Sequence, residues 1–312
     1  IKFENGYTLA LKENNEPLNI NFFIDDFYFN KEKSNNFISS RNNLLKIISS
    51  NLKKVSKKLQ NINSKLQECS NMDVYKLYGE LLTANLYKFK DAPNASYVEL
   101  ENYYDNNNLI KIPLDKSISV HKNIDKYFKK YNKLKNALTI VSEQKIEAEK
   151  ELDYIQSIVF SLENAQTLSD INEVFEEISE NVVTAKEVAK KTKNKQSKKK
   201  AKSEEFTFEP IEIYGYQVYI GKNNIQNDYL SLKFADKNDY WFHTQKIHGS
   251  HIILRTNGNT DVPDEVLTKC AKLAKQNSKA SNSSNVPVDY CLVRYVKKAS
   301  GAKPRNGDLY KL

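Results

Sequence analysis

The chain has 312 residues, 39% of them hydrophobic and 28% charged, and its formal net charge is +9. No apolar run is long enough to cross a bilayer, so we expect no membrane partner, and so polar a composition favours long exposed helices. The three cysteines, Cys69, Cys270 and Cys291, match no metal or disulfide spacing, which favours a reducing, cytoplasmic setting. Because the chain begins at Ile1 rather than Met, we expect a piece of a longer protein.

Positive charge is concentrated in the C-terminal part of the chain. Residues 186–202 hold nine lysines against Glu187 alone, a net charge of +8. Residues 203–312 carry a further +3, whereas residues 1–185 carry −2. A polyanionic partner should therefore contact the lysine tract or the domain after it. The tract has no apolar periodicity, so it is either a solvated linker or a tail that contacts RNA.

Residues 1–33 have the pattern of two short strands, at 7–11 and 18–22, with Pro17 ending the turn between them. Two strands are not stable by themselves. We therefore interpret this segment as the edge of an upstream domain, or as a piece that packs on the helix after it. That helix is expected to begin near Phe37 and to extend past Leu82.

Two apolar seams with alternating steps of four and three residues predict a coiled coil. The first seam is Ile48, Leu52, Val55, Leu59, Ile62, Leu66 and Cys69, and the second is Tyr127, Tyr131, Leu134, Leu138, Val141, Lys145, Ala148, Leu152, Ile155, Val159 and Leu162. Each helix would have about 45 residues and a length of roughly 65–70 Å. Lys145 is the polar position that would fix the register. The alternative is two core helices of a globular bundle.

A hairpin is predicted between the two helices. Strand-like segments at 97–101 and 109–112 flank the turn sequence at 105–108. The chain would reverse here, which makes the two helices antiparallel and places a structured tip, about residues 83–120, at the end of a rod. A rod with such a tip usually contacts something large.

The rest of the chain is read as an acidic helix, the lysine tract and an α+β domain. The acidic helix carries Glu173, Glu176, Glu177 and Glu180. For residues 206–312 the pattern predicts, in order, a hairpin at 211–220 around Tyr214-Gly215, a helix at 223–233, strands at 240–243 and 251–254, a helix at 264–279 and a strand at 286–296. The predicted fold class is thus α+β: a long antiparallel coiled-coil hairpin with a small capped tip, followed by a compact, mainly antiparallel domain.

The sequence does not favour a catalytic arrangement. His243, His248 and His251 have spacings of five and three, but no cysteine or carboxylate completes a metal-binding pattern. Ser250 beside His251, with Asp239 nearby, lacks the G-x-S-x-G elbow of serine hydrolases. There is also no P-loop and no G-x-G-x-x-G sequence. We predict no catalytic residue, no metal and no cofactor.

Recognition of a polyanion suits the last domain better. Between residues 269 and 305 nine lysines and arginines face Asp289 alone, with serines and a glycine interleaved, a composition that suits phosphate contacts. Trp241 either offers a stacking surface to an unpaired base, together with Tyr240 and His243, or packs in the core. The predicted RNA-binding residues are Trp241, His243, Gly249, Ser250, His251, Lys279, Arg294, Lys297, Lys298, Ser300, Lys303 and Arg305.

Several stretches of the chain resemble the NFACT family of ribosome quality-control factors, long described as fibronectin-binding protein A-like. The stretches that carry this resemblance are 219–224, 239–243, 249–251, 286–290 and 296–304 for the C-terminal NFACT-R domain, and 78–86 and 123–131 for the coiled-coil middle domain. His248 stands where the family usually has Pro, and Arg305 where it usually has Gly, which puts the conformation of two loops in question.

The resemblance implies a division of the chain and a function. Residues 1–33 would be the end of the N-terminal domain, 34–185 the middle domain, 186–205 a linker and 206–312 the NFACT-R domain. The family binds the large ribosomal subunit obstructed by peptidyl-tRNA, recruits tRNA and directs template-free alanine tailing of the stalled chain. This piece would contact rRNA, tRNA and ribosomal protein without catalysing a reaction.

The residues predicted to contact the ribosome from the tip are Glu80, Asn85, Tyr87, Lys88, Lys90 and Lys111. The alternative function is a surface adhesin that binds fibronectin or fibrinogen through the coil, which would require export of the protein.

Overall fold

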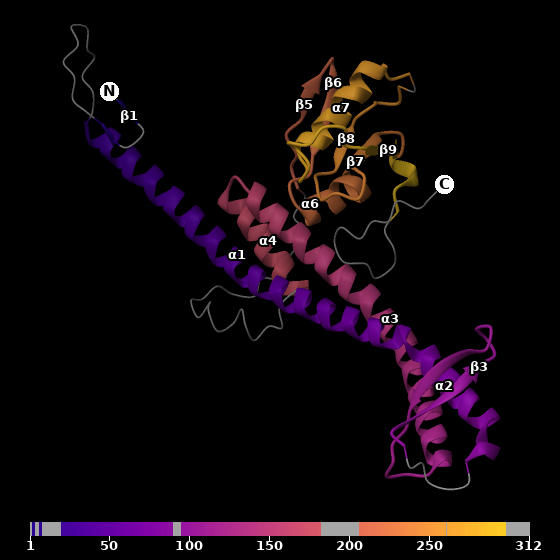
Figure 1. Cartoon of the computed structure of the whole chain (residues 1–312). Helices are drawn as coiled ribbons and strands as arrows, with labels where there is room; N and C mark the ends of the chain where they lie inside the picture. Colours follow the sequence, from indigo (N-terminus) through magenta and orange to yellow (C-terminus); the bar gives the residue numbers. More distant parts are fainter. Residues whose placement is uncertain are drawn as a thin grey trace. The chain divides into compact units, whose positions relative to one another are not determined.

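The computed structural model describes residues 2–3, 6–7, 20–89, 95–181, 206–259 and 261–297. The chain forms two compact units, one of Ile1–Leu52 with Tyr154–Leu312 and the other of Lys53–Asp153. Both long helices cross from one unit to the other, α1 (Ile20–Ser70) and α3 (Val120–Asn164) (Figure 1). Among the described residues, no helix is both long enough and apolar enough to span a membrane.

The N-terminal part differs from its prediction. Strands β1 (Lys2–Phe3) and β2 (Gly6–Tyr7) pair as a small hairpin, and helix α1 already begins at Ile20. The predicted strand at 18–22 is therefore wrong over 20–22, and the predicted helix start at Phe37 is 17 residues late. Residues 8–19 lie outside the described part of the chain.

Local side-chain pairs explain why helix α1 begins so early. The Nδ2 of Asn30 donates a hydrogen bond of 2.8 Å to Asp26 one turn earlier, and the ammonium of Lys31 lies 5.7 Å from the centroid of the Phe27 ring. No glycine or proline interrupts the segment 20–37. These pairs favour a helix although the segment has no apolar seam. The seam alone therefore predicts a later helix start. The predicted domain boundary at residues 33 and 34 falls inside this helix.

The coiled coil itself is confirmed in the unit Lys53–Asp153. Leu59, Ile62 and Ala148 form a buried cluster, with Leu66, Val141 and Leu152 packed around it. Every one of these residues is a predicted seam position. The ammonium of Lys145 pairs with Glu149 of the same helix at 3.7 Å, so its role in setting the register stays a prediction.

A small domain, which we call the tip, joins the two helices within the same unit. Helix α2 (Met72–Ala84) follows α1 after Asn71 alone, and the 3-10 turn η1 is Leu86–Lys88. Strands β3 (Tyr97–Asn102) and β4 (Asn108–Pro113) pair antiparallel, as predicted. Asn106 and Asn107 supply the positive φ angles that the turn needs, 47° and 60°.

The tip has its own hydrophobic core. Leu82 of α2, Leu100 and Ile112 of the hairpin and Ile124 of α3 belong to one buried cluster. The hydroxyl of Tyr127 donates to the carbonyl of Pro113, which ties the end of the hairpin to α3. Burial, together with the nearby Tyr78 and Tyr75, raises the pKa of Tyr127 to about 12, so this donor keeps its proton at neutral pH.

The C-terminal domain is a five-stranded antiparallel sheet in the order β5-β6-β8-β7-β9. Its strands are β5 (Ile211–Ile213), β6 (Tyr216–Ile220), β7 (Tyr240–Thr244), β8 (Ile252–Leu254) and β9 (Val288–Leu292). Its helical elements are α6 (Asn224–Tyr229), the π-helical turn η2 (Leu230–Phe234), α7 (Asp264–Gln276) and the 3-10 turn η3 (Val293–Tyr295). The predicted α+β class is confirmed.

Side chains alternate between the two faces of this sheet, as the strand period requires. On one face Phe242, Ile252 and Leu254 pack with Val266 and Cys270 of α7. On the other face a second cluster of buried residues includes Tyr219, Leu230, Trp241, Ile253 and Val293. The two faces thus have separate cores.

The last predicted strand, 286–296, is shorter in the structure. The ladder of β9 ends at Leu292, and η3 follows. The reason is that the backbone N–H of Val293 donates to the carbonyl of Asp239 at 2.9 Å, and the N–H of Arg294 donates to that of Lys237 at 3.2 Å. These two bonds hold η3 against the residues that precede β7.

Candidate nucleic-acid interface

Asn227 makes tight internal contacts with Gly221 and Gly249, the glycines of two predicted motifs. A side chain on Gly221 would place its Cβ 2.2 Å from Oδ1 of Asn227 and 3.0 Å from the Asn227 backbone. The same Oδ1 accepts the backbone N–H of His251 at 3.0 Å, and Nδ2 donates to the carbonyl of Gly249 at 3.3 Å. Asn227 therefore holds β6 and the loop before β8 together.

The loop of Gly249 and Ser250 is also held against the end of α7. Gly249 forms a β-bridge with Ser278, and a Cβ on Gly249 would lie 2.9 Å from the Ser278 Cβ. The backbone N–H of Ser250 donates to the Asn277 carbonyl at 2.9 Å, and that of Lys279 to the His248 carbonyl at 2.8 Å. This loop consequently fixes where the chain leaves α7 and where Lys279 begins the next segment.

Of the aromatic members of the predicted site, Trp241 and His251 are buried and His243 is half-buried. Trp241 is 3% exposed, and its ring packs edge-on against His251 with the centroids 5.1 Å apart. The hydroxyl of Ser231 lies 2.8 Å from Nδ1 of His251. His243 contacts both Trp241 and His251. The burial of Trp241 supports the core-packing alternative, because a ring enclosed in this way offers no face to a base.

Asp239, a candidate residue for a hydrolase, has structural contacts instead. Asp239 is 1% exposed, and its carboxylate accepts the backbone N–H groups of Asp236 and Thr256 and pairs with Arg255 at 3.2 Å. Burial raises the pKa of the Cys270 thiol to about 12, as suits a packing residue. Within the described ranges, no three His, Cys, Asp or Glu side chains are placed to hold a metal ion.

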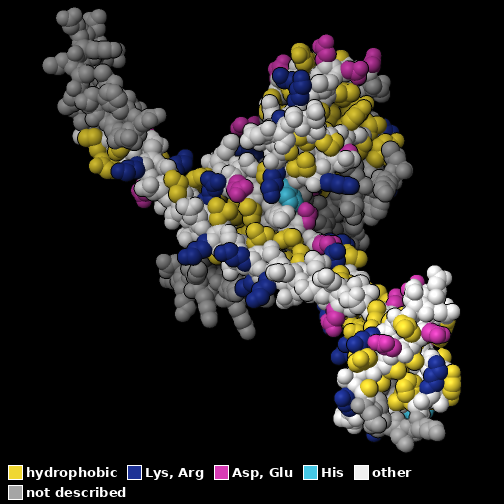
Figure 2. Space-filling view, in the orientation of Figure 1, with side chains coloured by type: hydrophobic (Ala, Val, Ile, Leu, Met, Phe, Trp, Pro, Cys, Tyr) yellow, Lys and Arg dark blue, Asp and Glu magenta, His cyan; other side chains and the backbone are white. Residues whose placement is uncertain are grey.

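Figure 2 shows lysine and arginine side chains at several places on the surface of this domain, and four lysines lie along or just after α7. Lys269, Lys272 and Lys279 are exposed and Lys275 is half-buried. None of the four ammonium groups has a carboxylate partner within ion-pair distance among the described residues. Lysines left unpaired in this way are available to phosphate groups.

The remaining predicted contacts follow β9. Arg294 is exposed, and one of its guanidinium nitrogens donates to Oδ1 of Asn238 at 2.7 Å. Lys297 is exposed at the end of the described chain. The other predicted members lie outside the described residues: Lys298, Ser300, Lys303 and Arg305.

The acidic helix α4 (Leu168–Asn181) binds the domain through amides, which the sequence analysis missed. Nδ2 of Asn224 donates to Ser157 at 3.0 Å and to Glu177 at 2.8 Å. Glu173 accepts from Asn223 at 2.6 Å and from Gln226 at 2.7 Å. These bonds tie α6 to α3 and α4, so the carboxylates of Glu173 and Glu177 are used within the protein. The adjacent asparagines at 223–224 were the sequence feature from which these amide contacts could have been predicted.

The tip carries an exposed aromatic group that the sequence analysis also missed. Tyr103 and Tyr104 lie in the hairpin turn with their ring centroids 4.7 Å apart and are 49% and 66% exposed. The carboxylate of Glu80 raises the pKa of Tyr104, which places this predicted contact beside the pair. Leu109 of β4 is 71% exposed. Two tyrosines before an Asp-Asn-Asn-Asn turn were the signal for this group.

The other predicted tip residues have mixed surroundings. Tyr87 is 78% exposed, with the Lys88 ammonium 5.7 Å from its ring centroid. The ammonium of Lys111 lies 3.5 Å from the ring centroid of Tyr97. Asn85 caps α2, since its Nδ2 donates to the Leu81 carbonyl at 2.9 Å. Lys90 lies outside the described residues.

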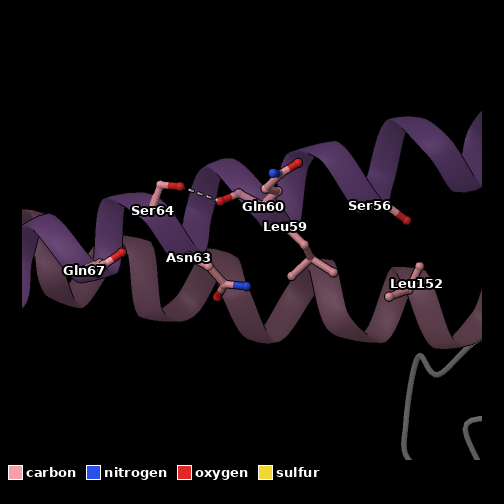
Figure 3. A pocket seen from close by; sticks show the side chains of 7 residues that line it. All are labelled: Ser56, Leu59, Gln60, Asn63, Ser64, Gln67 and Leu152. Atoms are coloured by element: carbon pink, nitrogen blue, oxygen red, sulfur yellow. Dashed lines mark hydrogen bonds between the residues drawn. The ribbon is translucent and has the colours of Figure 1, made fainter.

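A shallow groove on the coiled coil is a feature of helix packing. Figure 3 shows Leu59 of α1 directed at α3, and Ser56, Asn63 and Gln67 are among the other lining residues. The Ser64 hydroxyl is bonded to the Gln60 carbonyl of its own helix at 3.1 Å. All of the polar lining residues are uncharged, so the groove has no feature that selects a charged ligand.

The comparisons with known proteins agree with this domain structure. Residues 4–201 match the family model described as NFACT N-terminal and middle domains, and residues 204–304 match that of the NFACT protein RNA binding domain. The chain belongs to the NFACT family. The RNA-binding domain model spans the NFACT chain's basic α7 and all five strands of its sheet.

Relatives of this NFACT chain share much of its length. The Rqc2 homolog RqcH of Bacillus subtilis is 35% identical over 284 residues, which cover 90% of this chain and 48% of that protein. The RqcH of Streptococcus pneumoniae strain D39 is 31% identical over 93% of this chain and 50% of its own length. The NFACT chain thus spans about half the length of the curated relatives it matches.

A solved structure resembles the NFACT chain over most of its length. It is the C-terminal part of the fibronectin/fibrinogen-binding protein from Streptococcus suis, with a TM-score of 0.61 and 28% identity. The match covers 86% of this chain and 89% of that one. The likeness therefore extends over most of the chain.

Proposed function

We propose that this chain is the ribosome-docking part of an NFACT quality-control factor. The observation that carries the proposal is the basic surface of α7: lysines with no carboxylate partner among the described residues, on the domain that matches the RNA-binding family model. Such a surface binds phosphate and releases counterions as it does so. Relatives named RqcH support the ribosomal context.

Each described unit would supply a different contact. Residues 269–305 would bind phosphate groups of rRNA or tRNA, with Lys279, Arg294 and Lys297 among the described contacts. The tip would contact the large subunit through Tyr87, Lys88 and Lys111, with Tyr103 and Tyr104 added by the structure. In the complete protein this docking supports tRNA recruitment and alanine tailing of stalled chains, so the piece acts in the cytoplasm as a binding module and not as an enzyme. The domain limits at 34–185 and 206–312 remain predictions.

The test is co-sedimentation of this chain with purified large ribosomal subunits in sucrose gradients at two salt concentrations. We expect the chain to travel with the subunit at low salt and to dissociate steeply as salt rises, because each lysine–phosphate contact adds to the salt dependence. Failure to co-sediment at low salt would contradict the proposal.

The second candidate is an adhesin that binds fibronectin or fibrinogen. The observation in its favour is the likeness to the Streptococcus suis structure of that name. It requires the full-length protein on the cell surface. Fractionation of cells separates the two functions, since the ribosomal function predicts that the protein co-purifies with ribosomes and not with the wall fraction.

A further inference from the structure

A groove of about 710 Å³ lies between α7, the segment 283–286 and strand β9. One stripe of α7 forms its first wall: Asp264, Leu267, Thr268, Ala271, Lys272 and Lys275. These positions follow the three- and four-residue spacing of one helix face. The neighbouring face of the helix, with Val266, Cys270 and Ala274, is buried against the sheet. Leu267 and Ala271 of the stripe also pack partly on that core, whereas Asp264, Thr268 and Lys272 are exposed. The groove stripe is thus available to a ligand.

The floor of the groove is an aromatic ring at the edge of the sheet. Strand β9 is the last in the sheet order, and its Tyr290 stands opposite Phe242 of β7. The two rings are stacked, with centroids 5.7 Å apart and planes 14° apart. Phe242 is 1% exposed, whereas Tyr290 is 57% exposed. Phe242 therefore holds the tyrosine ring in one orientation and leaves the rest of it open.

Two ammonium groups lie on the wall beside this ring. Lys272 and Lys275 are one turn apart on α7 and line the groove with Tyr290. Asp264, the acidic residue of the same stripe, is eight residues before Lys272, which is about 12 Å along the helix axis. The exposed hydroxyls of Ser283 and Ser284 line the facing wall. The groove thus combines an aromatic surface, positive charge and small hydrogen-bonding groups.

We infer that this groove binds an unpaired RNA nucleotide, with the base stacked on Tyr290 and the phosphate at Lys272 and Lys275. A base accepts any flat aromatic partner, and proteins bind single-stranded RNA through such rings beside basic grooves. A base within a duplex has no free face to offer. An apolar peptide would leave the two ammonium groups without a partner while removing them from water. The inference rests on the RNA-binding role proposed above and names the kind of RNA and the residues.

The test measures the affinity of the whole chain for a short labelled oligouridylate and for a blunt RNA duplex by fluorescence anisotropy. We expect Tyr290→Ala to weaken binding of the oligouridylate about tenfold and Tyr290→Phe to change it less than about twofold, because stacking needs the ring and not the hydroxyl. Duplex binding should stay unchanged in both variants. Tyr214→Ala is the matched control, since Tyr214 is 69% exposed in the same domain but does not line the groove.

A second measurement needs no variant and so does not depend on folding of the Tyr290→Ala protein. Ultraviolet crosslinking of oligouridylate to the wild-type chain, followed by trypsin, should label the peptide of residues 280–294, which contains Tyr290. Crosslinks only to other peptides, or equal losses of duplex and single-strand affinity in a folded Tyr290→Ala protein, would overturn the inference.

The outcome is separable from that of the docking proposal. If the wild-type chain co-sediments with large subunits but Tyr290→Ala binds oligouridylate normally, the inference about the groove is wrong and the docking proposal stands. If the chain does not co-sediment but its oligouridylate binding depends on Tyr290, docking is wrong and the groove stands.

Discussion

The tip and the C-terminal domain differ in the side chains that dominate their exposed surfaces. The tip exposes tyrosine rings and a leucine, with Tyr87, Tyr103, Tyr104 and Leu109 between 49% and 78% exposed. The C-terminal domain exposes lysines of α7 that have no carboxylate partner among the described residues. The strength of an aromatic contact depends on the surface area that it buries, whereas a lysine–phosphate contact weakens as the salt concentration rises. If both surfaces contact the proposed partner, their contributions to binding would respond differently to salt.

Charge reversal on α7 and just after it should have the largest effect. Lys269→Glu with Lys279→Glu is expected to weaken binding to large subunits roughly 10- to 100-fold at low salt and to reduce the salt slope by about two, because two phosphate contacts become repulsive. The measurement is the binding constant as a function of salt concentration. Lys233→Glu with Lys237→Glu is the control, since it changes the net charge equally at exposed lysines outside α7. Equal losses in the two pairs would show that only net charge matters.

A pair of glycine substitutions should separate the stabilities of the two regions. In Gly221→Ala the new methyl meets the Asn227 backbone at 3.0 Å, and we expect a loss of about 2 kcal/mol in the free energy of unfolding of the C-terminal domain. In Gly79→Ala the methyl meets only the ring of Phe128, at 2.9 Å, and alanine favours helix α2 by about 1 kcal/mol, so the net change should be under about 1 kcal/mol. Denaturant unfolding measures both. Equal losses would contradict this account of the two contacts.

Removal of the tip tyrosines should weaken docking without changing its salt dependence. Tyr103→Ala with Tyr104→Ala is expected to lower the affinity for large subunits about tenfold, as for aromatic anchors at interfaces. The salt slope should stay as in the wild type, because no charge is lost. Tyr28→Ala serves as the control, since Tyr28 is 62% exposed on α1. An unchanged affinity in the double variant would remove the tip from the docking surface.

The smallest expected effect concerns acid stability of the tip. Asp115 accepts from the Ser117 hydroxyl at 2.5 Å and pairs with Lys126 at 3.1 Å, and these bonds lower its pKa to about 2. A carboxyl with a lowered pKa stabilises the fold above its ordinary value of 3.8, and the contribution is lost as pH falls toward 2. The melting temperature of Asp115→Asn should therefore lie slightly below that of the wild type at pH 6 and converge with it below pH 3.8. A constant difference down to pH 2 would contradict the assignment.

Features set by neighbouring residues were predictable from the sequence, and features set by distant ones were not. The heptad seam from Val55 to Cys69 and the Asn106-Asn107 turn are local patterns, and both are present in the structure. The amides of Asn224 and the open ring of Tyr290 depend on which helix packs on which part of the sheet. The same limit applies to Trp241. Its ring is buried in the structure, but the local sequence would be the same if the ring were an exposed stacking surface.

The most direct test of the account is the salt dependence of binding to large ribosomal subunits for three proteins: the wild type, Lys269→Glu with Lys279→Glu, and Tyr103→Ala with Tyr104→Ala. The account predicts a lower salt slope for the lysine variant and an unchanged slope with a lower affinity for the tyrosine variant. The claim of two chemically distinct docking surfaces would be contradicted if both variants changed slope and affinity alike, or if the wild type bound with no dependence on salt.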